Sequence, residues 1–193
     1  MSTSTRDSYH HGDLRAACLD AAMELLGEED ETALSLRGVA RRAGVSANAP
    51  YRHYRDKEAL LAALATRGFQ DLTARLVTAD SSAVPGAEFI ALAQAYVNYA
   101  VEHPALFRLM FGHPCSRSHP DAAAAAGQAS AVLAARVATA ILPAHRDAFM
   151  IGCWALVHGL AALILDGKLT ASDPGKVSEL VRVTVATMLA GDR

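Results

Sequence analysis

The sequence contains little of what fibrous, disulfide-bonded or β-rich proteins require. Its 193 residues include only 7 Pro, 13 Gly, 3 Cys and 4 Ile. The low Pro and Gly counts exclude a collagen-like or low-complexity chain. The cysteines Cys18, Cys115 and Cys153 are odd in number and widely spaced, which argues against a disulfide framework and for a reducing compartment. Residues 1–13 are polar and contain no apolar signal-peptide core, so we expect a cytoplasmic protein.

What is abundant is alanine, the strongest helix former. Hydrophobic residues make up 52% of the chain, with 41 Ala against 13 Val. This composition predicts an all-α fold, because β-branched residues are the ones that fill strands. The apolar periodicity, the Gly and Pro breaks and the capping residues predict about nine helices. We expect them near residues 13–26, 35–43, 47–54, 56–79, 86–103, 104–112, 121–141, 144–166 and 175–190.

Charge is distributed unevenly along the chain. Residues 1–34 carry a net charge of −6, residues 35–57 carry +5, and residues 58–193 carry −1. A short cationic segment therefore lies in an otherwise acidic protein. Arg residues on a helix often only form a solvated surface, so the charge alone does not indicate a function. The motif within the segment is what points to one.

The cationic segment has the pattern of a helix-turn-helix, with a short helix, a Gly turn and a second short helix between Ser35 and Tyr54. Ser35 is a good N-cap for the first helix, and Asp13 is expected to cap the helix before it. Ala40 is small where two helices must cross closely, and Gly44 permits the positive φ of a tight turn. The second helix of such a unit presents its N-terminal residues to base edges in the major groove of DNA.

On a helical wheel, polar and cationic residues of the second helix share the outward arc, while Pro50 and Tyr54 face the other helices. Asn48 can pair with a base, Tyr51 can contact a sugar, a thymine methyl group or a phosphate, and Arg37 begins the supporting helix within reach of DNA. Ser46 exposes backbone N–H groups at a helix start, a favourable site for phosphate. Pro50 removes one backbone hydrogen bond, so we expect the helix to start slightly bent. The predicted DNA-binding residues are Arg37, Ser46, Ala47, Asn48, Tyr51, Arg52, His53 and Lys57.

Residues 13–60 resemble the TetR family of bacterial transcriptional regulators. The resemblance is carried by Leu36-Arg-Gly-Val-Ala-Arg-Arg-Ala-Gly-Val-Ser46, by Tyr51-Arg-His-Tyr54 and by Asp56-Lys-Glu-Ala-Leu-Leu61, with Pro50 where the family usually has a residue such as Leu. It implies DNA contacts at Arg37, Ala47, Asn48, Tyr51, His53 and Lys57. It also implies a helix-turn-helix domain over residues 1–60, joined to a sensing and dimerisation domain over residues 61–193. We expect a repressor that leaves a palindromic operator, a double-stranded DNA site, when a small apolar effector binds.

The C-terminal part resembles a variant of the family's sensor domain that carries a Trp-x-x-x-His-Gly signature, here Trp154 to Gly159. Trp154 and His158 lie on one face of an apolar helix, so they face a core, a pocket or a subunit interface. A histidine buried only for packing is the more frequent outcome at such a position, and aromatic stripes usually pack as well. A sensor pocket needs apolar walls with a few polar groups, and these residues are the best supply of both. The candidate ligand-binding residues are Tyr96, Tyr99, His103, Phe107, Met110, Trp154 and His158.

The last two long helices are expected to pair two chains into a homodimer. The expected interface residues are Phe149, Leu156, Leu160, Leu163, Val181 and Val185. Ala148 to Leu165 reaches the lower length limit for a transmembrane helix, but His158 near its centre, its Ala and Gly content and its amphipathic neighbours favour a soluble core or interface helix. We therefore expect no membrane partner.

Other functions need residues for which the pattern is weak. His113, Cys115 and His119 are metal-ligand types but lack a fourth ligand nearby, and His10, His11 and Asp13 are explained more simply by helix capping. No catalytic triad, phosphate loop or carboxylate pair stands out, so we expect neither an enzyme nor a cofactor. A small helical enzyme or carrier would need a catalytic group within residues 96–158, and a metal sensor would need the His113, Cys115 and His119 set.

Overall fold

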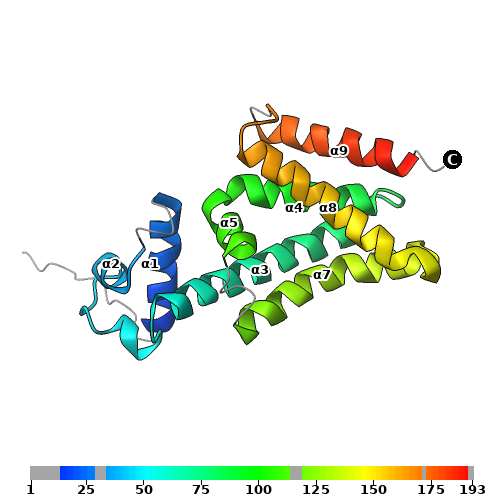
Figure 1. Cartoon of the computed structure of the whole chain (residues 1–193). Coiled ribbons are helices and arrows are strands. Elements are labelled where there is room, and N and C mark those ends of the chain that lie inside the picture. Colours follow the sequence, from blue (N-terminus) through cyan, green and yellow to red (C-terminus); the bar gives the residue numbers. More distant parts are fainter. Residues whose placement is uncertain (1–13, 29–33, 114–118, 171–172, 191–193) are drawn as a thin grey trace, which may run out of the picture. The chain divides into compact units, whose positions relative to one another are not determined.

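The computed structural model describes residues 14–28, 34–113, 119–170 and 173–190, and these residues are helical with no β-strand among them (Figure 1). The all-α prediction is confirmed. The described α-helices are α1 (Leu14–Glu28), α2 (Leu36–Arg42), α3 (Lys57–Ser82), α4 (Glu88–Glu102), α5 (Pro104–Gly112), α7 (Pro120–Ala140), α8 (Arg146–Leu165) and α9 (Pro174–Ala190). Two short 3₁₀ turns, η1 (Pro50–Arg52) and η2 (Pro143–His145), accompany them. The expected cap at Asp13 lies outside the described residues.

The chain forms two compact units, residues 1–60 and residues 61–193. In the first unit, the helix-turn-helix is organised by the residues that the sequence singles out. The Ser35 hydroxyl accepts a hydrogen bond from Gly38 N at 3.1 Å and caps α2. Gly44 adopts φ +67°, and Val45 N donates to Ala40 O at 3.0 Å, so the turn folds back onto the end of α2.

The second helix of this motif differs from the expectation. An α-helix over residues 47–54 does not form; the segment is a run of turns that includes η1. Pro50 has no N–H to donate to Ser46 O, and Ala49 N donates there at 2.9 Å instead, which closes a tighter turn. The helical segment therefore begins only at Pro50. It ends at His53 and Tyr54, whose N–H groups both donate to Pro50 O. The sequence predicted a slight bend at the start of this helix, whereas in the structure the first helical turn does not form.

The first unit has its own apolar core. Tyr54 is 2% exposed, its hydroxyl donates to Arg15 O at 3.1 Å, and the Arg15 guanidinium lies 5.8 Å from the centre of its ring. This bond ties Tyr54, the last residue of the turn segment (residues 47–54), to Arg15 of α1, which lies 39 residues earlier in the sequence. The remaining buried side chains come from α1, α2 and the turns, and include Cys18, Ala22, Leu26, Val39, Ala40 and Pro50.

The second unit is built around α4, which packs against α5, α7, α8 and α9 (Figure 1). Three of its helices begin with Pro, which is favourable at a first helical position because its missing N–H has no partner there. Asp173 Oδ1 accepts from Lys176 N at 2.9 Å at the start of α9. Gly68 lets α3 approach α5, because a Cβ at Gly68 would lie 2.6 Å from the Met110 sulfur.

Helix α8 is the least covered of these helices. Within the described residues, one segment, Pro143–Leu165, is both long enough and apolar enough to cross a membrane. Only 11% of its most apolar 18-residue stretch is buried in the chain. It nevertheless packs on α4 and α7, and Leu160 and Ala161 enter the core of the unit.

The residues of the expected dimer interface differ in how deeply the single chain buries them. Leu160, Val181 and Val185 are at most 7% exposed, because they fill the chain's own core against α4 and its neighbours. They have almost no surface left for a second chain. Phe149 and Leu156 are half-buried, and Leu163 is 45% exposed. The large apolar side chains that α8 and α9 leave exposed are Ile151, Trp154, Leu163, Val183, Met188 and Leu189.

Candidate functional site

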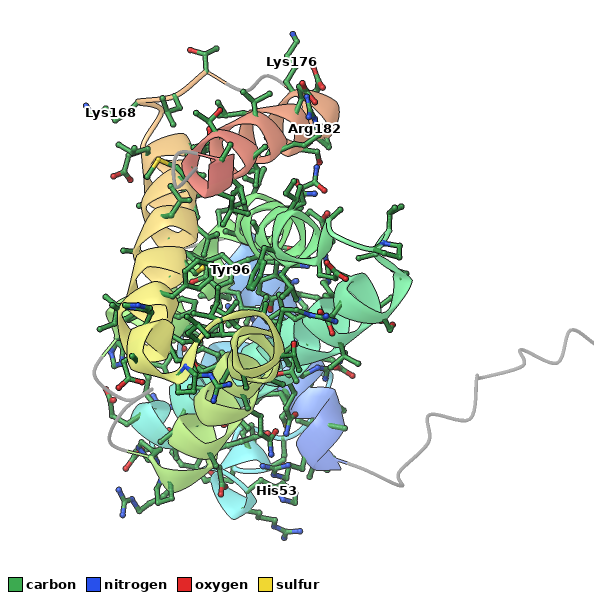
Figure 2. The ribbon with its side chains drawn as sticks, turned by 90° about the vertical axis from the view of Figure 1, so that its right-hand side faces the viewer. His53, Tyr96, Lys168, Lys176 and Arg182 are labelled. Carbon is green, nitrogen blue, oxygen red and sulfur yellow. The ribbon has the colours of Figure 1, made fainter. Side chains whose placement is uncertain are left out.

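The N-terminal unit presents its helix-turn-helix residues as an exposed surface. Arg37 at the start of α2 is exposed, as are residues 46–48 and 51–53 on either side of the buried Pro50, while Lys57 at the start of α3 is half-buried. Tyr51 is 48% exposed, and His53 lies at the surface (Figure 2). The exposed predicted residues are Arg37, Ser46, Ala47, Asn48, Tyr51, Arg52 and His53, which we call the reading surface together with Lys57.

Part of the cationic charge of this unit is used within the unit. Arg42 bonds Glu28 and lies 3.3 Å from Glu24 Oε2, which joins α2 to α1. The Arg42 hydrogen bond holds the pKa of the Glu28 carboxyl below its usual value. Arg55 Nε lies 2.8 Å from Asp56 Oδ2. Arg42 and Arg55 are thus held by carboxylates, whereas Arg37 and Arg52 extend from the reading surface.

The C-terminal unit contains a cavity of about 750 Å³. Its walls come from α3, α4, α5, α7, α8 and α9, and they consist mainly of Leu, Phe, Met, Ala and Val side chains. None of the described residues that line it is Asp, Glu, Lys, Arg or His. A pocket of this size with apolar walls and few polar groups is typical of a site for a small organic molecule.

Tyr96 is one of the residues with a polar group that line the cavity. It is 8% exposed and lies inside the C-terminal unit (Figure 2). Its hydroxyl oxygen lies 3.0 Å from His158 Nδ1. Phe107 stacks on the His158 ring with centroids 5.5 Å apart, and Phe111 meets the same ring edge-on at 5.0 Å. The histidine thus packs against two aromatic rings, and it orients the Tyr96 hydroxyl.

Burial keeps this pair uncharged. Desolvation raises the pKa of the Tyr96 hydroxyl, with the Trp154 side chain acting in the opposite direction. Desolvation also lowers the pKa of the His158 imidazole below its usual value of 6.5. At neutral pH the cavity therefore presents a neutral phenol supported by a neutral imidazole.

The lowered pKa of His158 predicts an acid-sensitive stability. As pH falls below about 6.5, the unfolded chain takes up the proton first, so the stabilisation is complete above that pH and is lost as pH falls through the folded-state pKa. We expect the free energy of unfolding to fall less between about pH 7 and pH 5 in His158→Asn, whose amide oxygen still accepts a hydrogen bond but does not titrate. Urea unfolding at several pH values measures this difference.

The matched control for this prediction is His145→Asn, which alters an exposed histidine of η2. This variant is expected to keep the wild-type pH dependence. Equal pH dependence in wild type and His158→Asn would show that the His158 imidazole contributes nothing to acid sensitivity.

The structure separates the predicted ligand-binding residues into two groups. Tyr96, Met110 and Trp154 line the cavity. The other four predicted ligand-binding residues, Tyr99, His103, Phe107 and His158, are not among its lining residues. Tyr99 is fully buried and donates to Gly68 O at 3.0 Å, and His103 ends α4 and lies 3.0 Å from an Arg75 nitrogen.

Many wall residues were not predicted. They are apolar side chains from six helices, such as Phe69 and Leu72 of α3, Phe89 of α4 and Leu133 of α7. Apolar periodicity indicates that such residues face inward, but it does not distinguish a residue that fills the core from one that borders an empty space. The cavity arises from the way the helices pack.

Among the described residues, no cluster of three His, Cys, Asp or Glu side chains could hold a metal ion. Of the weak metal candidates, Cys115 lies outside the described residues, and so do His10, His11 and Asp13.

An exposed helix-turn-helix in one helical unit and an apolar cavity in the other define a helix-turn-helix regulatory protein. Residues 19–64 match the family described as bacterial regulatory proteins, tetR family, and residues 89–188 match the tetracyclin repressor-like C-terminal domain. The chain belongs to the TetR family. This is a family of transcriptional regulators and not of enzymes, as the sequence led us to expect.

Individual relatives agree with this assignment. The chain is 29% identical to the HTH-type transcriptional regulator Rv1816 of Mycobacterium tuberculosis over 125 residues, which cover 63% of this chain and 53% of that protein. The match thus spans about half the length of that relative. A solved protein of unknown function from Rhodococcus sp. RHA1 is 36% identical, with a TM-score of 0.83 over 96% of this chain and 98% of that one. LfrR of Mycobacterium smegmatis, solved with proflavine, shares the fold at 22% identity, with a TM-score of 0.64 over 90% of this chain and 95% of its own.

Proposed function

We propose that the protein is a homodimeric repressor that binds a palindromic operator and leaves it when a small apolar molecule occupies the C-terminal cavity. The observation that carries the DNA-binding part is the reading surface, whose Arg37, Asn48, Tyr51, Arg52 and His53 side chains are exposed on the helix-turn-helix motif. Arg and Asn side chains read base edges, and Tyr, His and Lys side chains contact phosphates. Such a protein acts where the bacterial chromosome is, in the cytoplasm.

The test of DNA binding is a gel shift with the DNA that flanks the protein's own gene. Binding is expected to survive an excess of unrelated competitor DNA and to weaken as salt rises, because phosphate contacts release counterions. Failure to bind any such fragment would contradict the proposal.

The dimer is supported by the apolar side chains that α8 and α9 leave exposed. Large exposed apolar patches mark interfaces, and a two-fold contact places the same patch of each chain against the other. Two-fold symmetry also explains a palindromic operator with half-sites one helical turn or a multiple apart. Ile151, Trp154, Met188 and Leu189 belong both to this patch and to the cavity wall, so a second copy docked there would help to close the cavity.

A dimer variant should spare the cavity. We expect Leu163→Glu with Val183→Glu to weaken dimerisation at least about 100-fold, because both side chains are exposed in the single chain and four carboxylates would be buried in the contact. Neither residue lines the cavity. Sedimentation velocity at several protein concentrations measures the change.

The control for the dimer variant is Val84→Glu, which places a carboxylate on an apolar residue that is 73% exposed outside α8 and α9. It is expected to remain dimeric. A double variant that is as dimeric as wild type would place the interface elsewhere. If the wild-type chain is recovered with membranes and not in the soluble fraction, the exposed face of α8 contacts lipid and the dimer proposal is wrong.

Release from DNA is proposed to act through α3. This helix begins at Lys57, beside the turn segment, and continues to the cavity wall at Phe69, Leu72 and Leu76. The proposal requires two conformations that differ in the position of α3. A ligand that binds the cavity better in one of them shifts the population toward that conformation. Because α3 is continuous, such a shift changes the spacing of the two reading surfaces in the dimer. By analogy, LfrR with its proflavine supports a small-molecule effector for this chain.

A further inference from the structure

We propose that the cavity selects an uncharged, apolar molecule carrying a hydroxyl group, and that Tyr96 is the residue that recognises the hydroxyl. This inference rests on the proposed function of the cavity as an effector site and adds the chemical class of the effector. It assigns His158 of α8 as a positioning residue for the Tyr96 hydroxyl.

The described residues of the cavity walls carry no charge, which disfavours a charged ligand. No described wall residue carries a formal charge, and the polar side chains among them are Tyr96, Trp154, Ser130 and Cys153. Burial raises the pKa of the Cys153 thiol, so this group stays neutral as well. A carboxylate or ammonium ligand would lose its hydration with no opposite charge to replace it, and that cost is larger than any single neutral hydrogen bond returns.

The geometry around Tyr96 indicates what the ligand must offer. The Tyr96 hydroxyl oxygen lies 3.0 Å from His158 Nδ1, within hydrogen-bond distance. If His158 Nδ1 accepts, Tyr96 spends its proton there and keeps an acceptor position; if Nδ1 donates, Tyr96 keeps its own proton to donate.

A hydroxyl group satisfies Tyr96 in both cases, because it can either donate or accept. An ether, a ketone or a hydrocarbon cannot serve both tautomers of His158. The Phe107 and Phe111 rings pack on His158 and restrict the imidazole, so the Tyr96 hydroxyl is already oriented before the ligand enters. The rest of the cavity, with about 750 Å³ and apolar walls, suits a hydrocarbon or aromatic body.

The experiment compares four probes with one skeleton: 4-phenylphenol, biphenyl, biphenyl-4-carboxylate and 4-phenylbenzylamine. Equilibrium dialysis against the full chain measures their affinities. Trp154 is the only tryptophan of the chain and lies in the cavity wall, so its emission, excited at the red edge of its absorption, reports occupancy independently. We expect 4-phenylphenol to bind roughly 3- to 10-fold tighter than biphenyl, the range given by one net hydrogen bond. Both charged probes should bind weaker than biphenyl.

Two variants assign the effect to the hydroxyl of Tyr96. Tyr96→Phe keeps the ring and removes the hydroxyl, so 4-phenylphenol and biphenyl should bind this variant about equally. Tyr99→Phe is the matched control: it removes a buried hydroxyl three residues further along α4 that bonds Gly68 O, and Tyr99 does not line the cavity. The wild-type preference for 4-phenylphenol should persist in Tyr99→Phe.

Each other outcome overturns the inference. Tighter binding of the carboxylate or the ammonium probe, an unchanged preference in Tyr96→Phe, or no binding of any probe would each show that the assigned ligand class is wrong. The gel shift is run on the same preparation, so its failure is scored separately from the failure of the ligand class. If biphenyl binds as well as 4-phenylphenol while DNA binding is intact, the cavity still accepts apolar molecules but Tyr96 does not select a hydroxyl.

Discussion

Replacing Arg37 and Tyr51 together by Ala is expected to weaken operator binding at least about 100-fold. Each side chain that contacts a base or a phosphate contributes about 1–3 kcal/mol, and a dimer loses both contacts twice. Tyr51 is 48% exposed and Arg37 is exposed, so their removal leaves the core of the N-terminal unit intact. Fluorescence anisotropy with labelled operator at fixed salt measures the affinity, and circular dichroism verifies that the helices remain.

The control for the DNA-binding variant is Arg108→Ala. This change also removes one exposed arginine, but from α5 in the C-terminal unit, where Arg108 bonds Leu165 O. Its operator affinity is expected to stay within about twofold of wild type. If the double variant binds operator as tightly as Arg108→Ala does, the reading surface is misassigned and DNA binding through these residues is refuted.

Tyr54→Ala is expected to lower the free energy of unfolding of the N-terminal unit by about 3–5 kcal/mol, the usual cost of truncating a buried aromatic residue. Tyr54 is 2% exposed and its hydroxyl donates to Arg15 O, so the change leaves a cavity and removes the hydrogen bond to α1. That cost is a large part of the total stability of a typical protein, which is about 5–15 kcal/mol. Urea unfolding followed by circular dichroism measures it, and we expect DNA binding to be lost with the fold.

Two further tyrosine variants separate the causes of that loss. Tyr54→Phe keeps the ring and removes the hydrogen bond, so we expect a loss of about 1 kcal/mol. Tyr51→Ala, three residues earlier and exposed, should change stability by less than about 0.5 kcal/mol although it impairs DNA binding. A loss below about 1.5 kcal/mol in Tyr54→Ala would mean that the Tyr54 ring does not anchor the turn segment to α1.

Most of the fold could be predicted because its signals are local. Alanine content and apolar periodicity predicted a helical chain, and Ser35 and Gly44 act at the cap and the turn where the sequence placed them. The helix expected at residues 47–54 was wrong because one missing N–H, that of Pro50, outweighed the spacing of the motif. The inward faces of Pro50 and Tyr54 were nevertheless predicted correctly, since a turn that follows α2 must bury its apolar side against the same core.

The C-terminal site was predicted only in part. Tyr96 and His158 each stood out as polar groups on apolar helices, yet 62 residues separate them, and nothing local indicates that they meet at 3.0 Å. Periodicity placed Leu160, Val181 and Val185 on apolar faces, but it could not tell a face that packs on α4 from one that awaits a second chain. Both distinctions depend on which helices become neighbours.

The sequence by itself determined the helical class, the helix-turn-helix and its cationic segment, because caps, glycine conformations and apolar spacing act within a few residues of one another. The tertiary structure alone decided that Tyr54 anchors the turn segment to α1, and that α8 keeps an exposed apolar face. It also decided that six helices leave a neutral cavity with the Tyr96 hydroxyl in its wall. The physical reason is that burial, desolvation and empty space depend on which helices pack against each other. The sequence pattern shows only which side of each helix is apolar and must be covered, not which helix covers it.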